Sequence, residues 1–404
     1  MDPVVVIGNG VASVFAVESF RKHDRNTPII IIGDEPYLAY YRIRLSSLIG
    51  ETPDLEKLYI RSPEWYRELD VEVRLKEKVT GIDTYNKTIA LQGGNTVPYS
   101  KLLIASGSSP FVPPIPGTGL SGVFSIRSLD DVKQFNDFIE GKAFGAVIGG
   151  GPLGLEAAWA LAKKGKKVHV IEGAPHILFK LLDETAAEIL TDLAKNVNIN
   201  FIVNGQLNEV TGNGQVSELH LGDGNKIAAE FIVFATGVRP NIKFVANTPI
   251  QTARGIIVNE FMQTSVEDVY AAGDVAEYKG QVYGIWPVAK EQGATAGLNM
   301  AGIKTSYSEV VPSNYLKVFD IEVFSAGDLC KDVPNADAIK VLDREKCIYK
   351  AVFFKGGSPV GAILLGDTKP AVKISKAIKA GVKVPESIIK AGDFESFLNE
   401  CNKI

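Results

Sequence analysis

Cysteine and histidine are scarce in this chain of 404 residues, which limits the chemistry that its side chains can perform. The three cysteines, Cys330, Cys347 and Cys401, all lie in the last quarter, and no pair of them has CxxC or CxxxxC spacing. The four histidines are scattered and lack the spacing of metal ligands. We therefore expect neither a catalytic metal nor a redox-active disulfide.

Long apolar runs and an excess of one charge are also missing. No run approaches the roughly 20 apolar residues that span a bilayer, and the first expected strand begins by Val4, which leaves no room for a signal peptide. Lys and Arg number 43 against 47 Asp and Glu, a net charge of −4, which argues against a nucleic-acid-binding protein. We expect a cytoplasmic protein with neither a membrane nor a nucleic-acid partner; the oligomeric state is left open.

Glycine, in contrast, is abundant, with 39 residues, and much of it lies in turns between short apolar segments. The β-branched runs at 4–7 and 146–148 are each followed by a stretch with helical spacing. This alternation is typical of βαβ units with parallel strands. Beyond about residue 310, alternating apolar runs predict antiparallel strands followed by a helix. We therefore predict an α/β fold with two parallel sheets and a C-terminal α+β domain.

Two segments indicate where the chain passes between domains. The proline-rich residues 110–117 (PFVPPIPG) cannot pair as a central strand and are typical of a linker. A second crossing is expected near residues 237–241 (GVRPN). We predict a discontinuous first domain of residues 1–112 and 238–310. Residues 113–237 would form an inserted second domain, and residues 311–404 a C-terminal domain.

The first glycine-rich turn has the pattern Gly8-x-Gly10-x-x-Ser13. Gly8 permits a sharp turn, Gly10 lets the backbone approach a pyrophosphate, and the small Ser13 allows the helix to pack against the strand. The N–H groups at the start of the following helix favour a phosphate. Asp34 and Glu35 follow the second strand, and we favour Glu35 as the carboxylate for the ribose hydroxyls. This pattern alone is weak evidence, since an ordinary strand–helix turn has the same sequence.

The second turn, Gly149-x-Gly151-x-x-Gly154, matches the dinucleotide pattern more closely. Glu172 ends the next expected strand, where a carboxylate binds a free 2′-hydroxyl and repels a 2′-phosphate. This predicts NAD(H) rather than NADP(H), unless Glu172 is merely an exposed glutamate at a strand end. Two dinucleotide turns in one chain indicate a tightly held flavin and an exchanging nicotinamide.

Three further segments follow in a fixed order: residues 102–110 (LLIASGSSP), 232–241 (IVFATGVRPN) and 269–276 (VYAAGDVA). With the two turns, they resemble the crossovers and second FAD fingerprint of the pyridine-nucleotide oxidoreductases, flavoproteins that bind FAD and NAD(P)H. The resemblance covers the whole chain and implies an α/β fold with two Rossmann-like (glutathione-reductase-like) dinucleotide-binding domains plus a C-terminal α+β domain. Residues 35–49 (EPYLAYYRIRLSSLI) are similar to rubredoxin reductases and to the FAD domain of NADH-dependent nitrite reductase large subunits.

Carried over position by position, the resemblance implies two sets of binding residues. Those expected around FAD lie at the first turn, the ribose, the flavin side and the crossovers: Gly8, Gly10, Val11, Ala12, Glu35, Arg42, Val79, Ala105, Gly107, Arg127, Asp274 and Trp286. Those expected around NAD lie at the second turn, the strand after it and the second crossover: Gly149, Gly151, Pro152, Leu153, Gly154, Glu172 and Gly237.

Within these sets the resemblance implies particular roles. Asp274 would bond the ribityl chain, Trp286 would lie by the pyrimidine edge of the flavin, and Arg42 would contact the flavin side. Many relatives have a lysine where this chain has Ser47, so a lysine contact with the flavin is not expected. No side chain is assigned to catalysis, because the flavin carries the chemistry; Glu156 is either close to the nicotinamide or a charge on the helix surface.

The absence of cysteine before Cys330 bears on the electron acceptor. Family members that reduce disulfides, peroxide or coenzyme A disulfide carry cysteine in the first domain, and this chain does not. We therefore expect an FAD-dependent oxidoreductase that takes hydride from NADH and passes electrons to a small acidic electron-carrier protein, with rubredoxin preferred. Lysines within residues 369–383 would attract such a carrier, or would simply form a solvated helix face.

Two other interpretations stay open. The chain could be the reductase component of an oxygenase, a nitrite-reducing system or an O₂- or NO-reducing system. It could also be a non-enzymatic flavin-bearing sensor of NADH.

Overall fold

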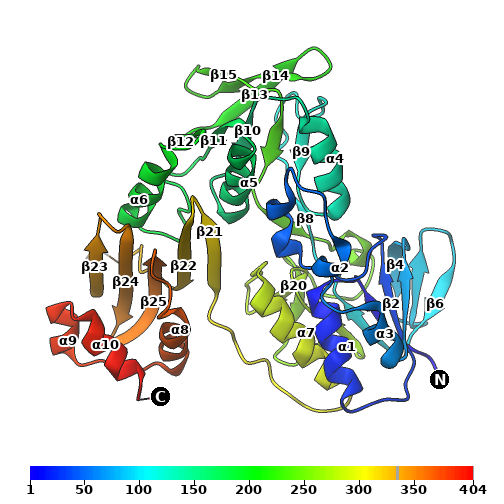
Figure 1. Ribbon diagram of the computed structural model, residues 1–404. Helices are drawn as coiled ribbons and strands as arrows, with labels where there is room; N and C mark the ends of the chain where they lie inside the picture. Colours follow the sequence, from blue (N-terminus) through cyan, green and yellow to red (C-terminus); the bar gives the residue numbers. More distant parts are fainter. Residues whose placement is uncertain (334–335, 404) are drawn as a thin grey trace. The chain divides into compact units, whose positions relative to one another are not determined.

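The computed structural model describes residues 1–333 and 336–403, which form two compact units. The first unit comprises Met1–Arg44, Pro53–Ser109 and Val238–Val310. The second unit comprises Leu45–Thr52, Pro110–Gly237 and Val311–Ile404. Figure 1 shows the course of the chain through both units.

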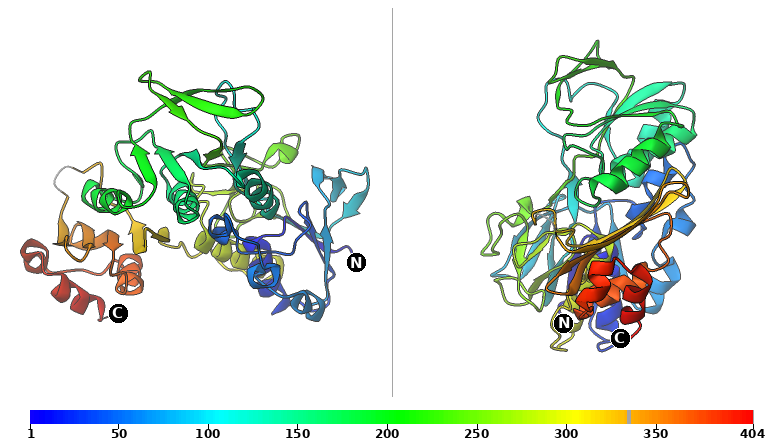
Figure 2. Two further views of the ribbon diagram at one scale, coloured as in Figure 1. Left: turned by 45° about the horizontal axis from the view of Figure 1, so that its top comes forward. Right: turned by 90° about the vertical axis from the view of Figure 1, so that its left-hand side faces the viewer.

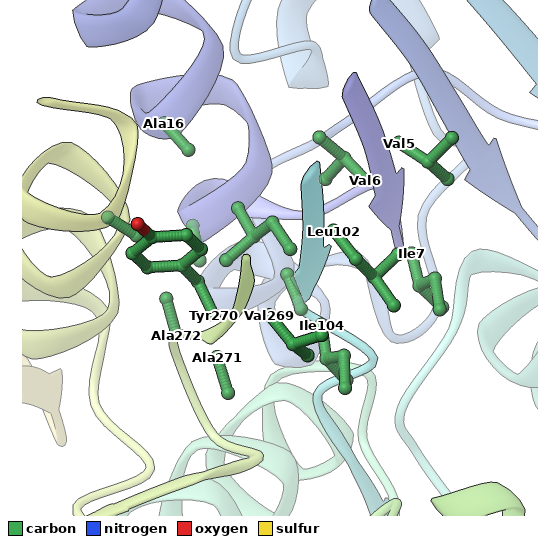
Figure 3. Packing of buried hydrophobic residues seen from close by; sticks show 14 of the residues in the cluster. Val5, Val6, Ile7, Ala16, Leu102, Ile104, Val269, Tyr270, Ala271 and Ala272 are labelled. Atoms are coloured by element: carbon green, nitrogen blue, oxygen red, sulfur yellow. The ribbon is translucent and has the colours of Figure 1, made fainter. Parts of the chain in front are cut away.

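A five-stranded parallel sheet forms the core of the first unit. Its order is β19 (Val269–Ala271), β7 (Lys101–Ile104), β1 (Val4–Ile7), β2 (Ile29–Gly33) and β3 (Val71–Leu75). Apart from Lys101 at the start of β7, the residues of the three inner strands are non-polar and buried, as is typical of a parallel sheet covered on both faces. Val6, Leu102 and Val269 lie on neighbouring strands of this sheet (Figure 3).

Two helices of the first unit pack so closely that their backbones are in contact. Helix α1 (Val11–Arg21) follows the first glycine turn and lies beside α7 (Trp286–Met300), as Figure 1 shows. A Cβ atom on Gly293 would lie 2.2 Å from the Ala12 carbonyl oxygen, and one on Gly297 would lie 2.1 Å from that of Ala16. Only glycine permits this approach, so α7 is held firmly against the helix that begins at the turn.

The other elements of the first unit are short. They include a β-meander of β4 to β6, the pair β18 and β20, and the pair β8 and β17, where the chain passes between units. Their bounds are η1 (Arg42–Arg44), α2 (Leu55–Leu58), α3 (Pro63–Glu68), β4 (Val79–Asp83), β5 (Thr88–Leu91), β6 (Thr96–Pro98), β8 (Ser108–Pro110), β17 (Val238–Pro240), η3 (Lys243–Val245), β18 (Ile256–Val258) and β20 (Ala276–Tyr278).

A second five-stranded parallel sheet belongs to the second unit. Its order is β12 (Ile199–Ile202), β11 (Lys167–Ile171), β10 (Phe144–Ile148), β16 (Ile232–Phe234) and β9 (Val123–Ser125). The helices of this part are α4 (Leu129–Ile139), α5 (Pro152–Lys163) and α6 (Glu184–Ala194), and its antiparallel strands are β13 (Leu207–Gly212), β14 (Val216–Leu221) and β15 (Lys226–Ala228). The two predicted Rossmann-like sheets are therefore confirmed.

The second unit also contains an antiparallel sheet near the C-terminus. Its order is β21 (Ser313–Val318), β22 (Ile321–Gly327), β25 (Ser358–Leu365), β24 (Ile348–Lys355) and β23 (Ala338–Asp343). Helices α8 (Ala371–Ala380), α9 (Glu386–Ala391) and α10 (Phe394–Cys401) cover one face of it (Figure 2). The C-terminal α+β part of the predicted fold class is thus confirmed.

No helix within residues 1–333 and 336–403 is both long enough and apolar enough to cross a membrane.

Candidate functional site

The first glycine turn joins β1 to α1 and has room above it for a phosphate. Gly8 has a φ of 101°, and a Cβ atom there would lie 2.2 Å from the Ala105 carbonyl oxygen, so a side chain is excluded. No atom lies within 4 Å of the position of a Cβ on Gly10. The hydroxyl of the fully buried Ser13 donates to the Gly8 carbonyl at 2.7 Å. Ser13 therefore has two effects. It is small enough for the helix to pack against the strand, and its hydrogen bond stabilises the turn.

The second turn has the same construction in the second unit. Gly149 has a φ of 110°, and a Cβ on Gly154 would lie 1.9 Å from the Gly149 carbonyl oxygen. The backbone of Gly151, the N-cap of α5, has no atom within 4 Å of where its Cβ would be, and Pro152 occupies the first turn of α5. Exposed N–H groups at the start of a helix attract phosphate. The residues at both turns therefore fit a dinucleotide pyrophosphate.

Glu172 is held against the second turn by hydrogen bonds. Its Oε2 accepts from the Gly150 N–H at 2.7 Å, and its Oε1 accepts from the Ala174 N–H at 2.8 Å. Both oxygens retain a further lone pair for a ligand hydroxyl. The carboxylate thus stands at the end of β11, beside the turn, in a fixed orientation.

Glu35 has close partners in the first unit. The Tyr40 hydroxyl donates to its Oε2 at 2.6 Å, and the Arg42 guanidinium donates to its Oε1. A cavity of about 20 Å³ lies beside them, and the buried side-chain oxygen of Asn9, which also lines it, has no partner among the described residues. Arg42, expected on the flavin side, therefore lies beside the carboxylate expected on the ribose.

The two crossovers are joined by hydrogen bonds from Asn241, and Ser108 of the first crossover also binds Asp274. The Ser108 hydroxyl donates to Asp274 Oδ2 at 2.8 Å. The Asn241 amide donates to the Ser106 carbonyl at 2.9 Å, and the Asn241 backbone N–H donates to the carbonyl of Gly107. Sequence analysis did not single out Ser108 or Asn241, although both occur in the quoted crossover segments.

The positions predicted for the two cofactors lie in different units. All of the positions predicted for NAD are in the second unit, and all of those predicted for FAD except Arg127 are in the first. Arg127 directly precedes Ser128, the N-cap of α4. Val79 is buried in the core of the first unit, and Val11 and Ala12 form the first turn of α1.

Trp286 is the centre of a group of aromatic and cationic side chains in the first unit. Its ring lies 5.8 Å from that of Phe15 and 6.3 Å from that of Tyr41. Lys290 lies over both Phe15 and Trp286, at 4.9 and 5.8 Å. Cations over aromatic rings are favourable contacts. With two further cations, this cation–aromatic cluster comprises Phe15, Tyr41, Arg44, Arg61, Trp286 and Lys290.

The segments that form this cluster are far apart in the sequence. Phe15 comes from α1, Arg61 precedes α3, and Trp286 and Lys290 come from the start of α7. The indole N–H of Trp286 is buried and has no hydrogen-bond partner among the described residues. Sequence analysis predicted only Trp286, because no local pattern joins the others.

Glu156 lies in α5 and is partly buried. The Ser46 hydroxyl donates to its Oε2 at 2.6 Å. Burial raises the pKa of Glu156 above its ordinary value, and the smaller effect of the Ser46 hydrogen bond lowers it.

The three cysteines are free thiols. Burial raises the pKa of Cys401 to about 11 and also raises that of Cys330, so neither thiol is ionised near neutral pH. In the part of the chain that the structure describes, no group of His, Cys, Asp and Glu side chains is arranged to hold a metal.

Residues 2–293 match the family described as pyridine nucleotide-disulphide oxidoreductase. The chain belongs to this family. Residues 312–382 match the C-terminal domain of rubredoxin NAD+ reductase. Family membership confirms the predicted class, an oxidoreductase flavoprotein, and its predicted cofactor, FAD.

The chain is similar to proteins of different lengths. The chain is 36% identical over 386 residues to nitrite reductase [NAD(P)H] of Bacillus subtilis, covering 95% of this chain but 48% of the relative. It is 33% identical to NADH-rubredoxin oxidoreductase of Clostridium acetobutylicum, covering 93% of this chain and 94% of the relative. The chain therefore spans about half the length of the nitrite reductase, but nearly all of the rubredoxin reductase.

Solved structures share the fold over nearly the whole chain. The crystal structure of NADH:rubredoxin oxidoreductase from Clostridium acetobutylicum has a TM-score of 0.81 at 30% identity, covering 98% of this chain and 99% of that one. The ferredoxin reductase of the CYP199A2 system from Rhodopseudomonas palustris has a TM-score of 0.90 at 23% identity and covers 99% of both chains.

Proposed function

We propose that this protein oxidises NADH and passes the electrons, through FAD, to a small acidic electron-carrier protein, with rubredoxin as the first choice. The observation that carries the proposal is the pair of glycine turns, one in each unit, each between a strand and a helix, in a chain without cysteine before Cys330. The match of residues 312–382 to a rubredoxin reductase C-terminal domain supports the choice of carrier.

Different residues of the chain would bind the two ligands. The turn at Gly8 and Gly10, with Glu35 and Asp274, would hold FAD, and the turn at Gly149–Gly154 with Glu172 would hold NADH. When bound, FAD supplies the ability to accept a hydride and to release electrons one at a time. Because the first unit contains no cysteine, its residues would bind the flavin without supplying a thiol for electron transfer.

The cation–aromatic cluster is our proposed docking surface for the carrier. It belongs to the same unit as the FAD turn, and α7, which begins at Trp286, packs on α1, which begins at that turn. Electron transfer weakens steeply with distance, so a carrier must bind near the flavin. Cations that already lie on aromatic rings lose little freedom when an acidic partner binds.

Stopped-flow reoxidation tests the proposed function. Purified protein should contain about one FAD per chain, be reduced rapidly by NADH, and be reoxidised faster by rubredoxin than by O₂. Absence of flavin would contradict the FAD assignment. Slow reduction by NADH, together with an NADH-dependent change in assembly, would instead favour a sensor.

A second candidate is the reductase part of a nitrite-reducing system. It is favoured by the 36% identity to a nitrite reductase of which this chain covers 48%. In that case the NADH-reduced protein would pass electrons to a separate redox protein of that system faster than to rubredoxin, which the same stopped-flow measurement would reveal.

A further inference from the structure

A loop of residues 172–183 connects β11 to α6 in the second unit, and we call it the β11–α6 loop. Its first residue, Glu172, binds the second glycine turn, since its Oε2 accepts from the Gly150 N–H at 2.7 Å. Leu178, in the middle of the loop, donates its backbone N–H to the Gly150 carbonyl at 2.8 Å. The loop is therefore folded back onto the turn, and both polar backbone groups of Gly150 are bonded to it.

Leu178 reaches the turn in a left-handed backbone conformation. Its φ is 51°, which is uncommon for leucine, and its side chain is buried beside those of Ile177 and Leu182. A backbone conformation of this kind persists only where the surrounding structure fixes it. The contacts at the other end of the loop therefore bear on whether the loop stays on the turn.

The other end of the loop is bonded to the antiparallel sheet near the C-terminus. The Tyr349 hydroxyl of β24 donates to Asp183 Oδ2 at 2.5 Å, and Lys340 of β23 donates to the same oxygen at 3.1 Å. Asp183 Oδ1 accepts from the Ala186 N–H and so caps α6. Tyr349 is 2% exposed, and burial, together with the hydrogen bond to Asp183, raises its pKa above the ordinary value. The hydroxyl thus keeps its proton and remains a donor near neutral pH.

The middle of the loop also contacts this part of the chain. Lys331, in the segment after β22, donates to the Phe179 carbonyl oxygen and lies 4.3 Å from the centre of the Phe179 ring. Phe179 directly follows Leu178. Residues near the C-terminal sheet therefore bind the loop at two places, one of them next to the residue that bonds to the turn.

The antiparallel sheet has a separate anchor on the rest of the second unit. Phe319, between β21 and β22, is buried, and its ring centre lies 5.6 Å from that of Trp159 in α5 and 6.2 Å from that of Phe201 in β12. Because this packing does not involve Tyr349, removal of the Tyr349 hydroxyl should loosen the loop and leave the sheet in place.

We propose that Tyr349 is a positioning residue for NADH: through Asp183 it holds the β11–α6 loop closed on the second turn, so the C-terminal sheet sets the affinity for NADH. The inference rests on the proposed function, since it requires NADH at that turn. Glu172 is expected at the ribose of the adenosine half, so the loop that begins with it borders that half. The apparent affinity then falls with the fraction of molecules in which the loop is closed.

Steady-state reduction of ferricyanide by the FAD-loaded protein tests this with two electron donors. One is NADH, and the other is reduced nicotinamide mononucleotide, which lacks the adenosine half. Tyr349→Phe should raise the KM for NADH about tenfold, because one hydrogen bond to a carboxylate is lost. The kcat should be unchanged, because saturating NADH closes the loop, and kcat/KM for the mononucleotide should also be unchanged.

Tyr315→Phe is the matched control for this measurement. It removes a hydroxyl from β21 of the same sheet, at a residue that is 57% exposed. Both donors should give wild-type kinetics in this variant. A general loss of stability in the sheet, in contrast, would change the kinetics with both donors alike.

Hydrogen exchange observes the loop without NADH. In Tyr349→Phe, backbone amides within residues 173–182 should exchange about tenfold faster than in the wild type, because the Leu178 N–H leaves the Gly150 carbonyl more often. Amides of α5 should exchange as in the wild type. Tyr315→Phe should leave exchange in both segments unchanged.

Three outcomes would overturn the inference. One is a wild-type KM for NADH in Tyr349→Phe. Another is an equal loss with NADH and with the mononucleotide, because the substitution would then affect the whole site. The third is unchanged exchange in the β11–α6 loop. If the wild type itself does not oxidise NADH, the proposed function is overturned as well, whereas wild-type kinetics in Tyr349→Phe leave the proposed function intact.

Discussion

At the scale of single residues, Glu172 combines a structural role in the second glycine turn with an expected role in ligand binding. Its carboxylate accepts two backbone N–H groups, one from the second glycine turn and one from the loop after β11. It also presents negative charge where the ribose of a dinucleotide is expected. A substitution here therefore changes both the shape of the turn and the choice of ligand, and the two effects must be separated.

Glu172→Arg should lower the preference for NADH over NADPH. The change removes a hydrogen-bonded carboxylate and adds a cation that suits a 2′-phosphate, a combined effect of roughly ten- to a hundredfold in the ratio of kcat/KM values. Steady-state dye reduction with both nucleotides measures it. Glu172→Gln removes the charge without adding a cation and keeps an oxygen for only one of the two backbone N–H groups, so it should lower the preference less than Glu172→Arg does. If Glu172→Arg keeps the wild-type ratio, Glu172 is not at the ribose.

Local patterns predicted the residues of the two turns because a strand, a glycine turn and a helix are adjacent in the chain. Gly8, Gly149 and Gly154 are required by close backbone approaches, and a pattern of glycines reveals such requirements directly. The pairing of Ser46 with Glu156 spans 110 positions and could not be predicted in this way. The cation–aromatic cluster was missed for the same reason, since its members meet only after folding.

At the scale of elements, the packing of α7 on α1 fixes the surroundings of the first turn. The two helices touch where Gly293 and Gly297 face Ala12 and Ala16. Gln292 of α7 is fully buried and accepts from the Gly273 backbone N–H, next to Asp274. The stripe of small residues therefore places Asp274, Trp286 and the turn in one rigid group.

Gly297→Ala should lower stability and FAD content together. The new Cβ would lie 2.1 Å from the Ala16 carbonyl oxygen, so the helices must separate, at a cost of roughly 1–3 kcal/mol. Thermal unfolding and the flavin-to-protein absorbance ratio measure the two effects. Gly93→Ala, with no atom within 4 Å of the added carbon, should change stability by less than about 0.5 kcal/mol. Equal behaviour of the two variants would show that the helices tolerate separation.

At the scale of the whole molecule, two basic surfaces could receive an acidic carrier. The cation–aromatic cluster belongs to the first unit, and the lysines of α8 belong to the second. Lys369 and Lys376 are exposed, and Val372 between them is 70% exposed, as expected of an ordinary solvated helix face. Only the cluster shares a unit with the FAD positions, which is why we expect the carrier there.

Charge reversal distinguishes the two surfaces. Lys290→Glu should slow reduction of the carrier about tenfold at low ionic strength, because steering by opposite charge is lost, and the deficit should shrink as salt screens the charges. Lys376→Glu, the matched change on α8, should leave the rate near that of the wild type.

The measurement is the second-order rate constant for reoxidation of the NADH-reduced protein by rubredoxin. Flavin content and the rate of flavin reduction by NADH are measured in both variants, because Lys290 lies over Trp286, a residue expected beside the flavin, and an effect on the flavin must be separated from an effect on docking. A slow Lys376→Glu beside a normal Lys290→Glu would move the docking surface to α8, and the carrier would then have to accept its electrons from the side of the second unit.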